Sequence, residues 1–207
     1  MKVKFCGLRR EEDIKYANEF MPDYVGYVFT ASKRQISAEV AKVLNSKLSS
    51  KIKSVGVFVN EDLENIIRVV EDAKLQVVQL HGDESLQYIE AIRIRLPQIE
   101  LWKAVRVRTC DGIMEADKLP VDKLVLDAFS EKAYGGTGEV ANLTIINQVK
   151  LQLTKPFFIA GGINIGNIGS IINDILPYGI DISGGIETDG FKDKGKIKAI
   201  LELIRRV

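Results

Sequence analysis

Two residues that could exchange protons stand at the ends of apolar runs. Cys6 ends the run over residues 3–6, and Asp127 ends the run over residues 123–127. A cysteine thiol, with an ordinary pKa of about 8.5, becomes a base near neutral pH when a cation or a dipole favours its ionised form. A carboxyl between apolar neighbours tends to stay protonated and can act as an acid. Such a pair would suit proton transfer on opposite sides of a sugar, with neither a metal nor a redox cofactor.

Each of the two residues also has a purely structural interpretation. An isolated cysteine in an apolar run is usually a buried hydrophobic side chain. An aspartate that ends a strand often accepts hydrogen bonds from the following turn. The residue types and their spacing alone leave both interpretations of Cys6 and Asp127 open.

Two glycine-rich turns could bind a phosphate. Gly161-Gly162 follows one apolar run, and Ser183-Gly184-Gly185 follows the next. Glycines let the backbone approach a ligand closely with its N–H groups directed at it, and a short helix expected around Glu187 would add its positive N-terminal end. The alternative is that these glycines only form tight turns. Two such turns after consecutive strands favour the phosphate site.

Other candidate residues carry weaker signals. Arg34 has the two-pronged guanidinium that fits a carboxylate, although a charge in a polar loop is usually only solvated. His81, the only histidine, is interpreted as a hydrogen-bonded support at a strand end rather than as a base. Lys103 could form a Schiff base only if it faced inward, and Trp102 competes for that position. Cys110 is expected at the surface or at a helix start, without a role.

The elements that must position these residues repeat along the chain. Each unit is a short apolar run, typical of a strand buried on both faces, followed by a segment with helical spacing. The expected strands cover residues 3–6, 24–29, 53–59, 77–80, 101–105, 123–127, 157–160 and 179–182. The expected helices cover residues 10–20, 63–74, 84–96, 112–118, 143–151, 168–176 and 195–206. One more helix is expected after Ser37, its N-cap; Asn60 or Asp62 and Asn164 or Asn167 are candidate caps of two others.

A parallel (β/α)₈ TIM barrel, an α/β fold, has eight strand–helix units, the number counted here. A doubly wound open sheet usually has only five or six strands. No linker or low-complexity segment divides the chain, so we expect a single domain over residues 1–207. In such a barrel the C-terminal ends of the strands face a common mouth. Cys6, Asp127 and the glycine turns are therefore expected at one end of the barrel.

The composition narrows the classes of partner. The formal net charge of +1 argues against a nucleic-acid or membrane partner. It is compatible with a small phosphorylated substrate, because a few local donors can bind a phosphate without changing the total charge. Two cysteines without C-x-x-C spacing, and one histidine, make a structural zinc site implausible and fit a reducing cytoplasm. Neither a signal peptide nor a stretch near the ~20 apolar residues of a membrane span is evident. The sequence leaves open whether the protein is a monomer or a homodimer.

The residues singled out above, with their neighbours, resemble the phosphoribosylanthranilate isomerase family nearly from end to end. Each motif is weak alone, and their ordered set is specific. The motifs are Lys4-Phe5-Cys6-Gly7-Leu8, Ser32-Lys33-Arg34, Val55-Gly56-Val57-Phe58-Val59, Val78-Gln79-Leu80-His81-Gly82, Leu126-Asp127, Tyr134-Gly135-Gly136-Thr137-Gly138, Ala160-Gly161-Gly162 and Asp181-Ile182-Ser183-Gly184-Gly185-Ile186-Glu187.

The resemblance implies a single TIM barrel that performs a cofactor-free Amadori rearrangement of N-(5-phosphoribosyl)anthranilate, a step of tryptophan biosynthesis. It implies that Asp127 is the general acid, which protonates the ribose ring oxygen, and that Cys6 is the general base, which takes the proton from C2 of the sugar. Arg34 would hold the anthranilate carboxylate. The backbone at Gly162 and at Ser183, Gly184 and Gly185 would bind the phosphate.

The chain departs from the family pattern at a few positions. Glu139 stands where the family usually has lysine, and Asn142-Leu143 replace aspartate–tryptophan. Gly184 replaces a serine, which keeps the backbone donor and removes a hydroxyl. Two alternatives remain: another sugar-phosphate barrel, such as a pentose-phosphate epimerase, and a non-catalytic paralogue that only binds a phosphorylated ligand. The epimerase would need paired carboxylates or a set of metal-binding histidines and aspartates.

Overall fold

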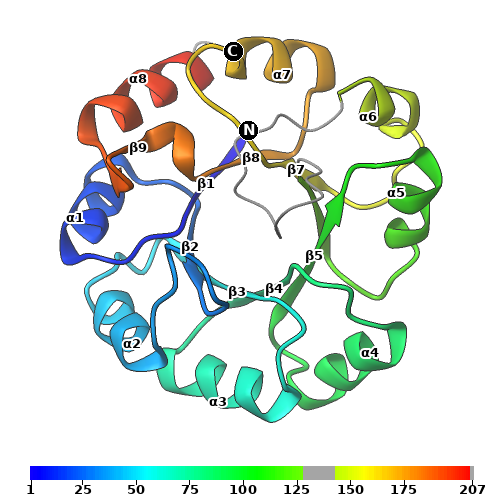
Figure 1. The fold of residues 1–207 in the computed structure, drawn as a ribbon, viewed down its shortest axis with the longest axis horizontal. Coiled ribbons are helices and arrows are strands. Elements are labelled where there is room, and N and C mark those ends of the chain that lie inside the picture. The colour runs from blue at the N-terminus through cyan, green and yellow to red at the C-terminus, as the bar shows by residue number, and fades with distance from the viewer. Residues whose placement is uncertain (128–142, 206–207) are drawn as a thin grey trace. The chain divides into compact units, whose positions relative to one another are not determined.

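A computed structural model describes residues 1–127 and 143–205. Eight parallel strands form a closed barrel in the order β1-β2-β3-β4-β5-β6-β7-β8, and helices alternate with them along the chain (Figure 1). The predicted parallel (β/α)₈ TIM barrel is thereby confirmed.

The strands coincide closely with the apolar runs, because each is buried on both faces. Their bounds are Lys2–Cys6 (β1), Tyr24–Val28 (β2), Lys53–Phe58 (β3), Val77–Leu80 (β4), Glu100–Arg106 (β5), Lys123–Asp127 (β6), Phe157–Ile159 (β7) and Gly179–Ile182 (β8). After β8, one 3₁₀ turn (η1, Gly184–Ile186) leads into a small antiparallel hairpin of Glu187–Thr188 (β9) and Phe191–Lys192 (β10).

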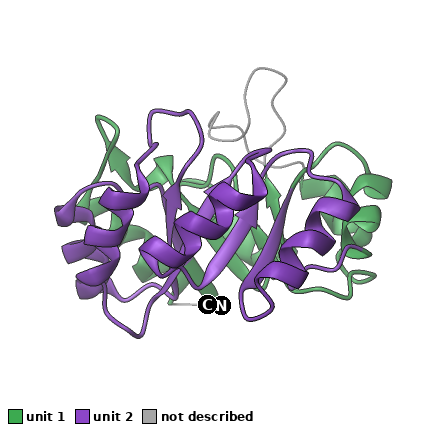
Figure 2. Cartoon of the chain, turned by 90° about the horizontal axis from the view of Figure 1, so that it is seen from below, with its two compact units in different colours: residues 1–3, 105–118, 123–207 green, residues 4–104, 119–122 purple. Residues whose placement is uncertain are grey.

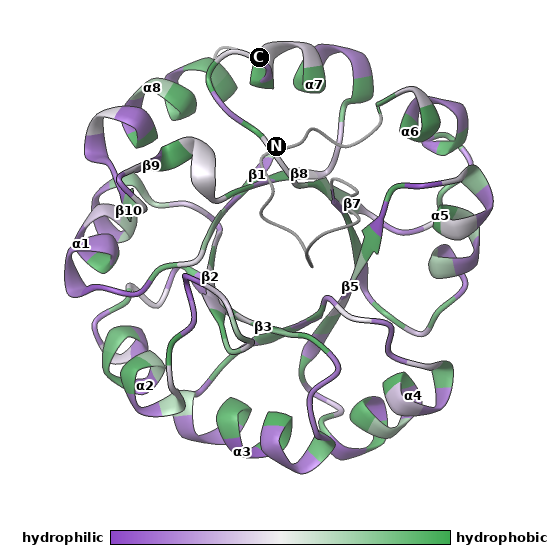
Figure 3. Ribbon diagram, viewed as in Figure 1, coloured by the Kyte–Doolittle hydropathy of each residue, from purple (hydrophilic) through white to green (hydrophobic). Residues whose placement is uncertain are grey.

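The helices are short and amphipathic. Their bounds are Glu11–Phe20 (α1), Ala38–Ser46 (α2), Leu63–Ala73 (α3), Leu86–Arg95 (α4), Cys110–Asp117 (α5), Leu143–Val149 (α6), Ile168–Ile175 (α7) and Lys194–Ile204 (α8). In α3, for example, Ile66, Val70 and Ala73 are buried at helical spacing. The helices accordingly carry both hydrophobic and hydrophilic residues (Figure 3). Over the ranges described, none of them combines the length and the apolar character that crossing a membrane requires.

Side-chain caps decide where the helices begin. Ser37 accepts a hydrogen bond from the N–H of Val40, as predicted, and Asp62 rather than Asn60 caps α3. The helix expected over residues 84–96 begins only at Leu86, because Ser85 is the N-cap. Its predicted first residue, Glu84, lies in the preceding loop.

Three other expectations need correction. The helix expected over residues 112–118 begins at Cys110, because the hydroxyl of Thr109 caps it by accepting from the N–H of Gly112. The helix expected over residues 143–151 ends at Val149. The short helix expected around Glu187 is only the single 3₁₀ turn η1, and Glu187 itself belongs to β9.

The chain forms two compact units, coloured separately in Figure 2. One comprises residues 4–104 and 119–122, and the other comprises residues 1–3, 105–118 and 123–207. The single domain expected over residues 1–207 stays a prediction. We describe each unit by itself.

Strand register in the first unit determines which side chains share a face. Lys4 on β1 donates a hydrogen bond to Gln79 on β4, at 2.9 Å from Nζ to Oε1. Because β1 and β4 are not neighbouring strands, these two side chains meet across the interior of the barrel. Cys6, two residues after Lys4, shares this interior face, and so does Trp102, which pairs with Gln79 in the β4–β5 ladder.

A buried phenol in β2 gives a test of this packing. Tyr27 is fully buried, and within the described residues its hydroxyl has no hydrogen-bond partner; burial also raises the pKa of this phenol. A buried hydroxyl without a partner destabilises the folded state. We therefore expect Tyr27→Phe to raise the free energy of unfolding by about 1 kcal/mol, measured as a higher urea midpoint at an unchanged slope.

Tyr88 provides the matched control. Its hydroxyl donates to the carbonyl of Glu61 at 2.6 Å, so Tyr88→Phe should lower the free energy of unfolding. If Tyr27→Phe destabilises the protein as Tyr88→Phe does, the Tyr27 hydroxyl is satisfied by a group such as a bound water.

Candidate active site

The C-terminal end of β1 carries Cys6, where the sequence predicted it. The side chain is partly exposed, and Gly7 follows with φ +78°, in the region that favours glycine. This conformation lets the N–H groups of Gly7 and Leu8 both donate to the carbonyl of Gly26, at 2.8 and 3.1 Å. The turn therefore fixes the direction that the chain takes after β1, immediately beyond the thiol.

The thiol of Cys6 occupies space that Gly26 leaves open. A Cβ atom on Gly26 would lie 2.9 Å from Cys6 Sγ and 3.2 Å from Lys4 Cε. The thiol and the aliphatic stem of Lys4 therefore border the same gap in the wall of the barrel. Any side chain at position 26 would displace one of them.

A buried polar chain lies on the same interior face. The ammonium of Lys4 donates to Gln79 Oε1, so the amide nitrogen of Gln79 is left to donate to Nδ1 of His81, at 3.1 Å. Nδ1 of His81 is the acceptor in this arrangement. His81 is a hydrogen-bonded residue at the end of β4, as predicted.

Sequence reasoning missed Lys4 and Gln79. The available signal was their position: each is a long polar side chain two residues before a strand-end residue of interest, Cys6 or His81. Residues two apart on a strand share a face, so this spacing placed both polar groups in the barrel interior.

The hypothesis that Lys103 forms a Schiff base is wrong, because successive side chains of a strand point to opposite faces. Trp102 takes the interior position, so Lys103 lies on the opposite face. There its ammonium donates to the carbonyl of Gly82 at 2.7 Å and pairs with the carboxylate of Glu84 at 2.9 Å. Lys103 thus stabilises the loop after β4 rather than facing the interior.

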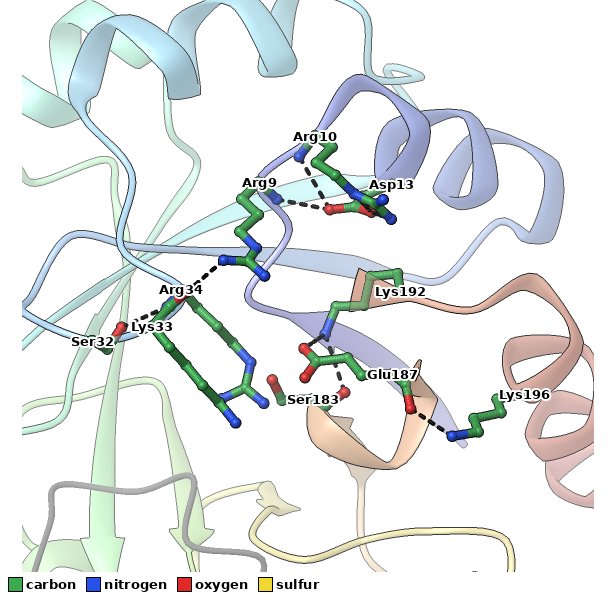
Figure 4. Close-up of polar contacts among 10 residues, drawn as sticks. All are labelled: Arg9, Arg10, Asp13, Ser32, Lys33, Arg34, Ser183, Glu187, Lys192 and Lys196. Atoms are coloured by element: carbon green, nitrogen blue, oxygen red, sulfur yellow. Dashed lines mark hydrogen bonds and ion pairs between the residues drawn. The ribbon is translucent and has the colours of Figure 1, made fainter. Parts of the chain in front are cut away.

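Arg34 lies against the turn that follows Cys6. A Cβ atom on Gly7 would come within 2.3 Å of Arg34 Cδ, so the stem of the arginine lies directly over the Gly7 backbone. The Arg34 N–H donates to Ser32 Oγ at 3.1 Å, and the guanidinium of Arg9 donates to the carbonyl of Lys33 at 2.6 Å (Figure 4). The structure therefore places one predicted site residue, Arg34, against the residue that follows another, Cys6.

The second unit contains both glycine turns. After β7, Gly161 and Gly162 have φ +83° and +64°, conformations that strain other residues. The carbonyl of Gly162 accepts hydrogen bonds from the side-chain amides of Asn164 and Asn167, at 3.0 and 2.9 Å. Because a trans peptide directs its C=O and N–H oppositely, the N–H of Ile163 points away from these two asparagines.

The turn after β8 packs against the turn after β7. A Cβ atom on Gly185 would lie 1.9 Å from the carbonyl oxygen of Ile163, so only glycine fits there. On its other side, the carbonyl of Ser183 accepts a hydrogen bond from Lys192 Nζ at 3.1 Å. Lys192, which the sequence reasoning did not single out, also pairs with Glu187 (Figure 4).

Asp127 is the last residue of β6, as predicted, and it is 4 % exposed. Its carbonyl accepts a hydrogen bond from the N–H of Val107 at 3.1 Å. Since β6 pairs with β7, Asp127 and the Gly161-Gly162 turn end neighbouring strands of the same unit. The predicted glycine-rich loop over residues 134–138, Glu139 and Asn142 lie outside the described residues.

Two further sequence-based expectations concern other side chains. Cys110 begins α5, and its thiol donates to Gln148 Oε1 at 3.1 Å, in agreement with a helix-start position. In the described part of the chain, no three histidine, cysteine, aspartate or glutamate side chains are grouped so that they could hold a metal ion.

Comparison with known proteins identifies the family. The sequence model of N-(5'-phosphoribosyl)anthranilate (PRA) isomerase matches residues 3–203. The N-(5'-phosphoribosyl)anthranilate isomerase of Thermoanaerobacter pseudethanolicus is 42 % identical over 207 residues, which cover 100 % of this chain and 99 % of that protein.

Two solved structures extend the comparison. Monomers of dimeric phosphoribosylanthranilate isomerase from Thermotoga maritima superpose with a TM-score of 0.86 at 31 % identity, over 100 % of both chains. A phosphoribosylanthranilate isomerase in complex with reduced 1-(o-carboxyphenylamino)-1-deoxyribulose 5-phosphate has the same TM-score, identity and coverage. The chain therefore belongs to the N-(5'-phosphoribosyl)anthranilate isomerase family, the isomerases of tryptophan biosynthesis.

Proposed function

We propose that this protein catalyses the Amadori rearrangement of N-(5-phosphoribosyl)anthranilate to 1-(2-carboxyphenylamino)-1-deoxyribulose 5-phosphate, with Cys6 as general base and Asp127 as general acid. The observation that carries the proposal is that a thiol and a carboxyl each end a strand of a barrel that belongs to this family. A structural relative binds the reduced product of this reaction, which supports the assignment of the substrate.

The reaction requires two proton transfers on one sugar. Asp127 protonates the ribose ring oxygen, the bond from that oxygen to C1 breaks, and the anthranilate nitrogen forms a Schiff base with C1. The thiolate of Cys6 then removes the proton from C2. The C2–H electron pair forms the C1–C2 double bond of an enolamine, while the electron pair of the C=N double bond returns to the anthranilate nitrogen. Loss of the C2 hydroxyl proton and protonation of C1 give the ketose. Atoms and electrons balance within the substrate, so the proposed reaction uses no cofactor.

The surroundings of Cys6 support its role as a base. Lys4 is fully buried, and the end of its aliphatic stem lies over Gly26 beside Cys6 Sγ. A cation beside a thiol favours the thiolate, which is the form that can accept a proton. The ammonium is held in the interior by Gln79, so its position is fixed.

The other proposed contacts bind the two ends of the substrate, its carboxylate and its phosphate. Arg34, whose stem lies over Gly7, would bind the anthranilate carboxylate through its guanidinium. The backbone N–H groups at Gly162 and at Ser183, Gly184 and Gly185 would bind the phosphate. Turns after strands seven and eight are the common phosphate site of this fold.

The proton-transfer roles can be tested by removing each group. We expect Cys6→Ala and Asp127→Asn each to lower kcat by about 10²- to 10⁴-fold, because each removes a general acid or base. Turnover is followed as the loss of substrate fluorescence after mixing, with ribulose 5-phosphate as a control substrate for an epimerase. Cys110→Ala removes the other thiol and should leave kcat unchanged.

An undiminished rate in Cys6→Ala or in Asp127→Asn would show that the residue does not have the role assigned to it. A wild-type protein that binds orthophosphate but turns over neither substrate would instead support the non-catalytic alternative.

The role of Arg34 predicts a selective loss of substrate binding. We expect Arg34→Met to raise KM about 10- to 100-fold, which corresponds to the loss of a charge-assisted contact with a carboxylate. Inhibition by orthophosphate should stay within about twofold of wild type, a change of less than 0.5 kcal/mol. Lys33→Met is the control, because Lys33 holds the loop through its main-chain carbonyl, which the substitution keeps. Equal weakening of substrate and orthophosphate would indicate a general electrostatic effect.

Because the Cys6 thiol occupies the gap over Gly26, we expect a substitution of Gly26 to lower kcat although glycine has no reactive group. Gly26→Ala would place a methyl group 2.9 Å from Cys6 Sγ and force the thiol to move. A displacement of about 1 Å can cost about 100-fold in rate, so we expect kcat to fall by about 10- to 100-fold with the fold retained. Gly169→Ala, where a Cβ atom would meet nothing within 4 Å, should leave kcat unchanged. Wild-type kcat in Gly26→Ala would show that the thiol position is not critical.

A further inference from the structure

We infer that Lys192, paired with the buried carboxylate of Glu187, is a positioning residue that directs the N–H of Gly184 at the phosphate of the ligand. The inference rests on the proposed function, which assigns the phosphate to the turn after β8. It adds a role for two side chains that do not themselves contact the ligand.

The pair is almost fully removed from solvent. The side chains of Lys192 and Glu187 are 2 % and 6 % exposed, and Nζ lies 2.7 Å from Oε1. Removing two charges from water costs several kcal/mol for each ion, and an apolar pair of similar volume is often at least as stable. Stability alone is therefore a weak reason for a buried ion pair, which suggests a role in positioning.

The geometry of Lys192 indicates what it positions. Its ammonium donates a second hydrogen bond, at 3.1 Å, to the carbonyl of Ser183 (Figure 4). That carbonyl belongs to the peptide that joins Ser183 to Gly184. Because a trans peptide is planar and directs its C=O and N–H oppositely, the N–H of Gly184 must point away from the buried pair. Lys192 thus determines the orientation of a backbone donor without facing the ligand.

The opposite side of the turn is fixed by a steric contact. Gly185 packs against the carbonyl oxygen of Ile163, where even a methyl group would not fit. The turn is therefore held between a hydrogen bond from Lys192 and the backbone of the loop after β7. Two hydrogen bonds to the Ser183 carbonyl oppose rotation of the Ser183–Gly184 peptide: the bond from Lys192 at 3.1 Å and a longer one from the N–H of Ile186 at 3.4 Å. The glycine contact fixes position rather than orientation.

A neighbouring lysine provides an internal control. Lys196 Nζ donates to the main-chain carbonyl of Glu187 at 2.6 Å, whereas the Ser183 carbonyl accepts from Lys192. Lys196→Met would loosen the β9–β10 hairpin without removing the donor to the Ser183 carbonyl. This variant therefore distinguishes an effect of hairpin stability from an effect of the orientation of the Ser183–Gly184 peptide.

The experiment compares orthophosphate binding and stability in a set of full-length variants. Lys192→Met leaves the Glu187 carboxylate buried without its cation, so both stability and affinity should fall. The double variant Glu187→Met/Lys192→Met removes both charges and should recover most of the lost thermal stability. The Ser183 carbonyl has then lost the Lys192 donor and keeps the longer hydrogen bond, 3.4 Å, from the N–H of Ile186. The Kd for orthophosphate should therefore stay about tenfold above wild type in the double variant. Lys192→Arg keeps the donor and should retain most of the affinity.

Kinetics with N-(5-phosphoribosyl)anthranilate give a second readout. A contact with a phosphate that is bound equally in the ground state and in the transition state changes KM rather than kcat. We therefore expect the double variant to show a KM about tenfold higher, with kcat within about threefold of wild type. Lys196→Met should show neither change.

Three results would overturn the inference: wild-type orthophosphate affinity in the double variant, an equal loss in Lys196→Met, or no binding of orthophosphate by the wild-type protein. If the double variant does not fold, Lys192→Met assayed below its melting temperature decides the same question. Orthophosphate binding without turnover by the wild-type protein would contradict the proposed function and would leave the test of Lys192 intact.

Discussion

Successive side chains of a barrel strand point to opposite faces, so each strand offers only alternate residues to the interior. This constraint separates Trp102 from Lys103 and places Lys4 and Cys6 on one face. It also means that a buried polar side chain on the interior face, such as Lys4 or Gln79, must find a partner there. The chain from Lys4 through Gln79 to His81 satisfies that requirement with three side chains. The surroundings of the thiol therefore follow from strand periodicity.

Three lysines are buried in the described part of the chain: Lys4, Lys103 and Lys192. Each ammonium is held by at least one acceptor. Lys103 and Lys192 each combine a carboxylate with a main-chain carbonyl, so each ties a loop to the barrel through its backbone. Lys4 has a neutral amide as its acceptor on β4 and lies beside a thiol. The same residue type thus fixes backbone orientation in two places and supplies a charge in the third.

Much of the architecture could be predicted from the sequence, because parallel barrel strands are continuous apolar runs and each ends in a turn signal. Asp127 and Gly179–Ile182 lie where the apolar pattern placed them. The predicted helix starts were less accurate, because a polar residue such as Glu84 can either begin a helix or bind the preceding loop. The contacts of Lys192 with Ser183 and of Arg34 with Gly7 could not be predicted. They depend on how loops pack, and a sequence pattern reports only the period within one element.

Two glycines shape the site because they have no side chain, and not because of their backbone conformation. Neither Gly26 nor Gly185 has a positive φ, so an alanine could adopt either backbone conformation. What alanine could not do is share the volume, which the thiol of Cys6 occupies in one case and the carbonyl of Ile163 in the other. A side chain can rotate away from a methyl group, whereas the carbonyl of Ile163 cannot move without the backbone of the loop after β7. Position 185 is therefore the stricter of the two, since a substitution there would separate the two turns assigned to the phosphate.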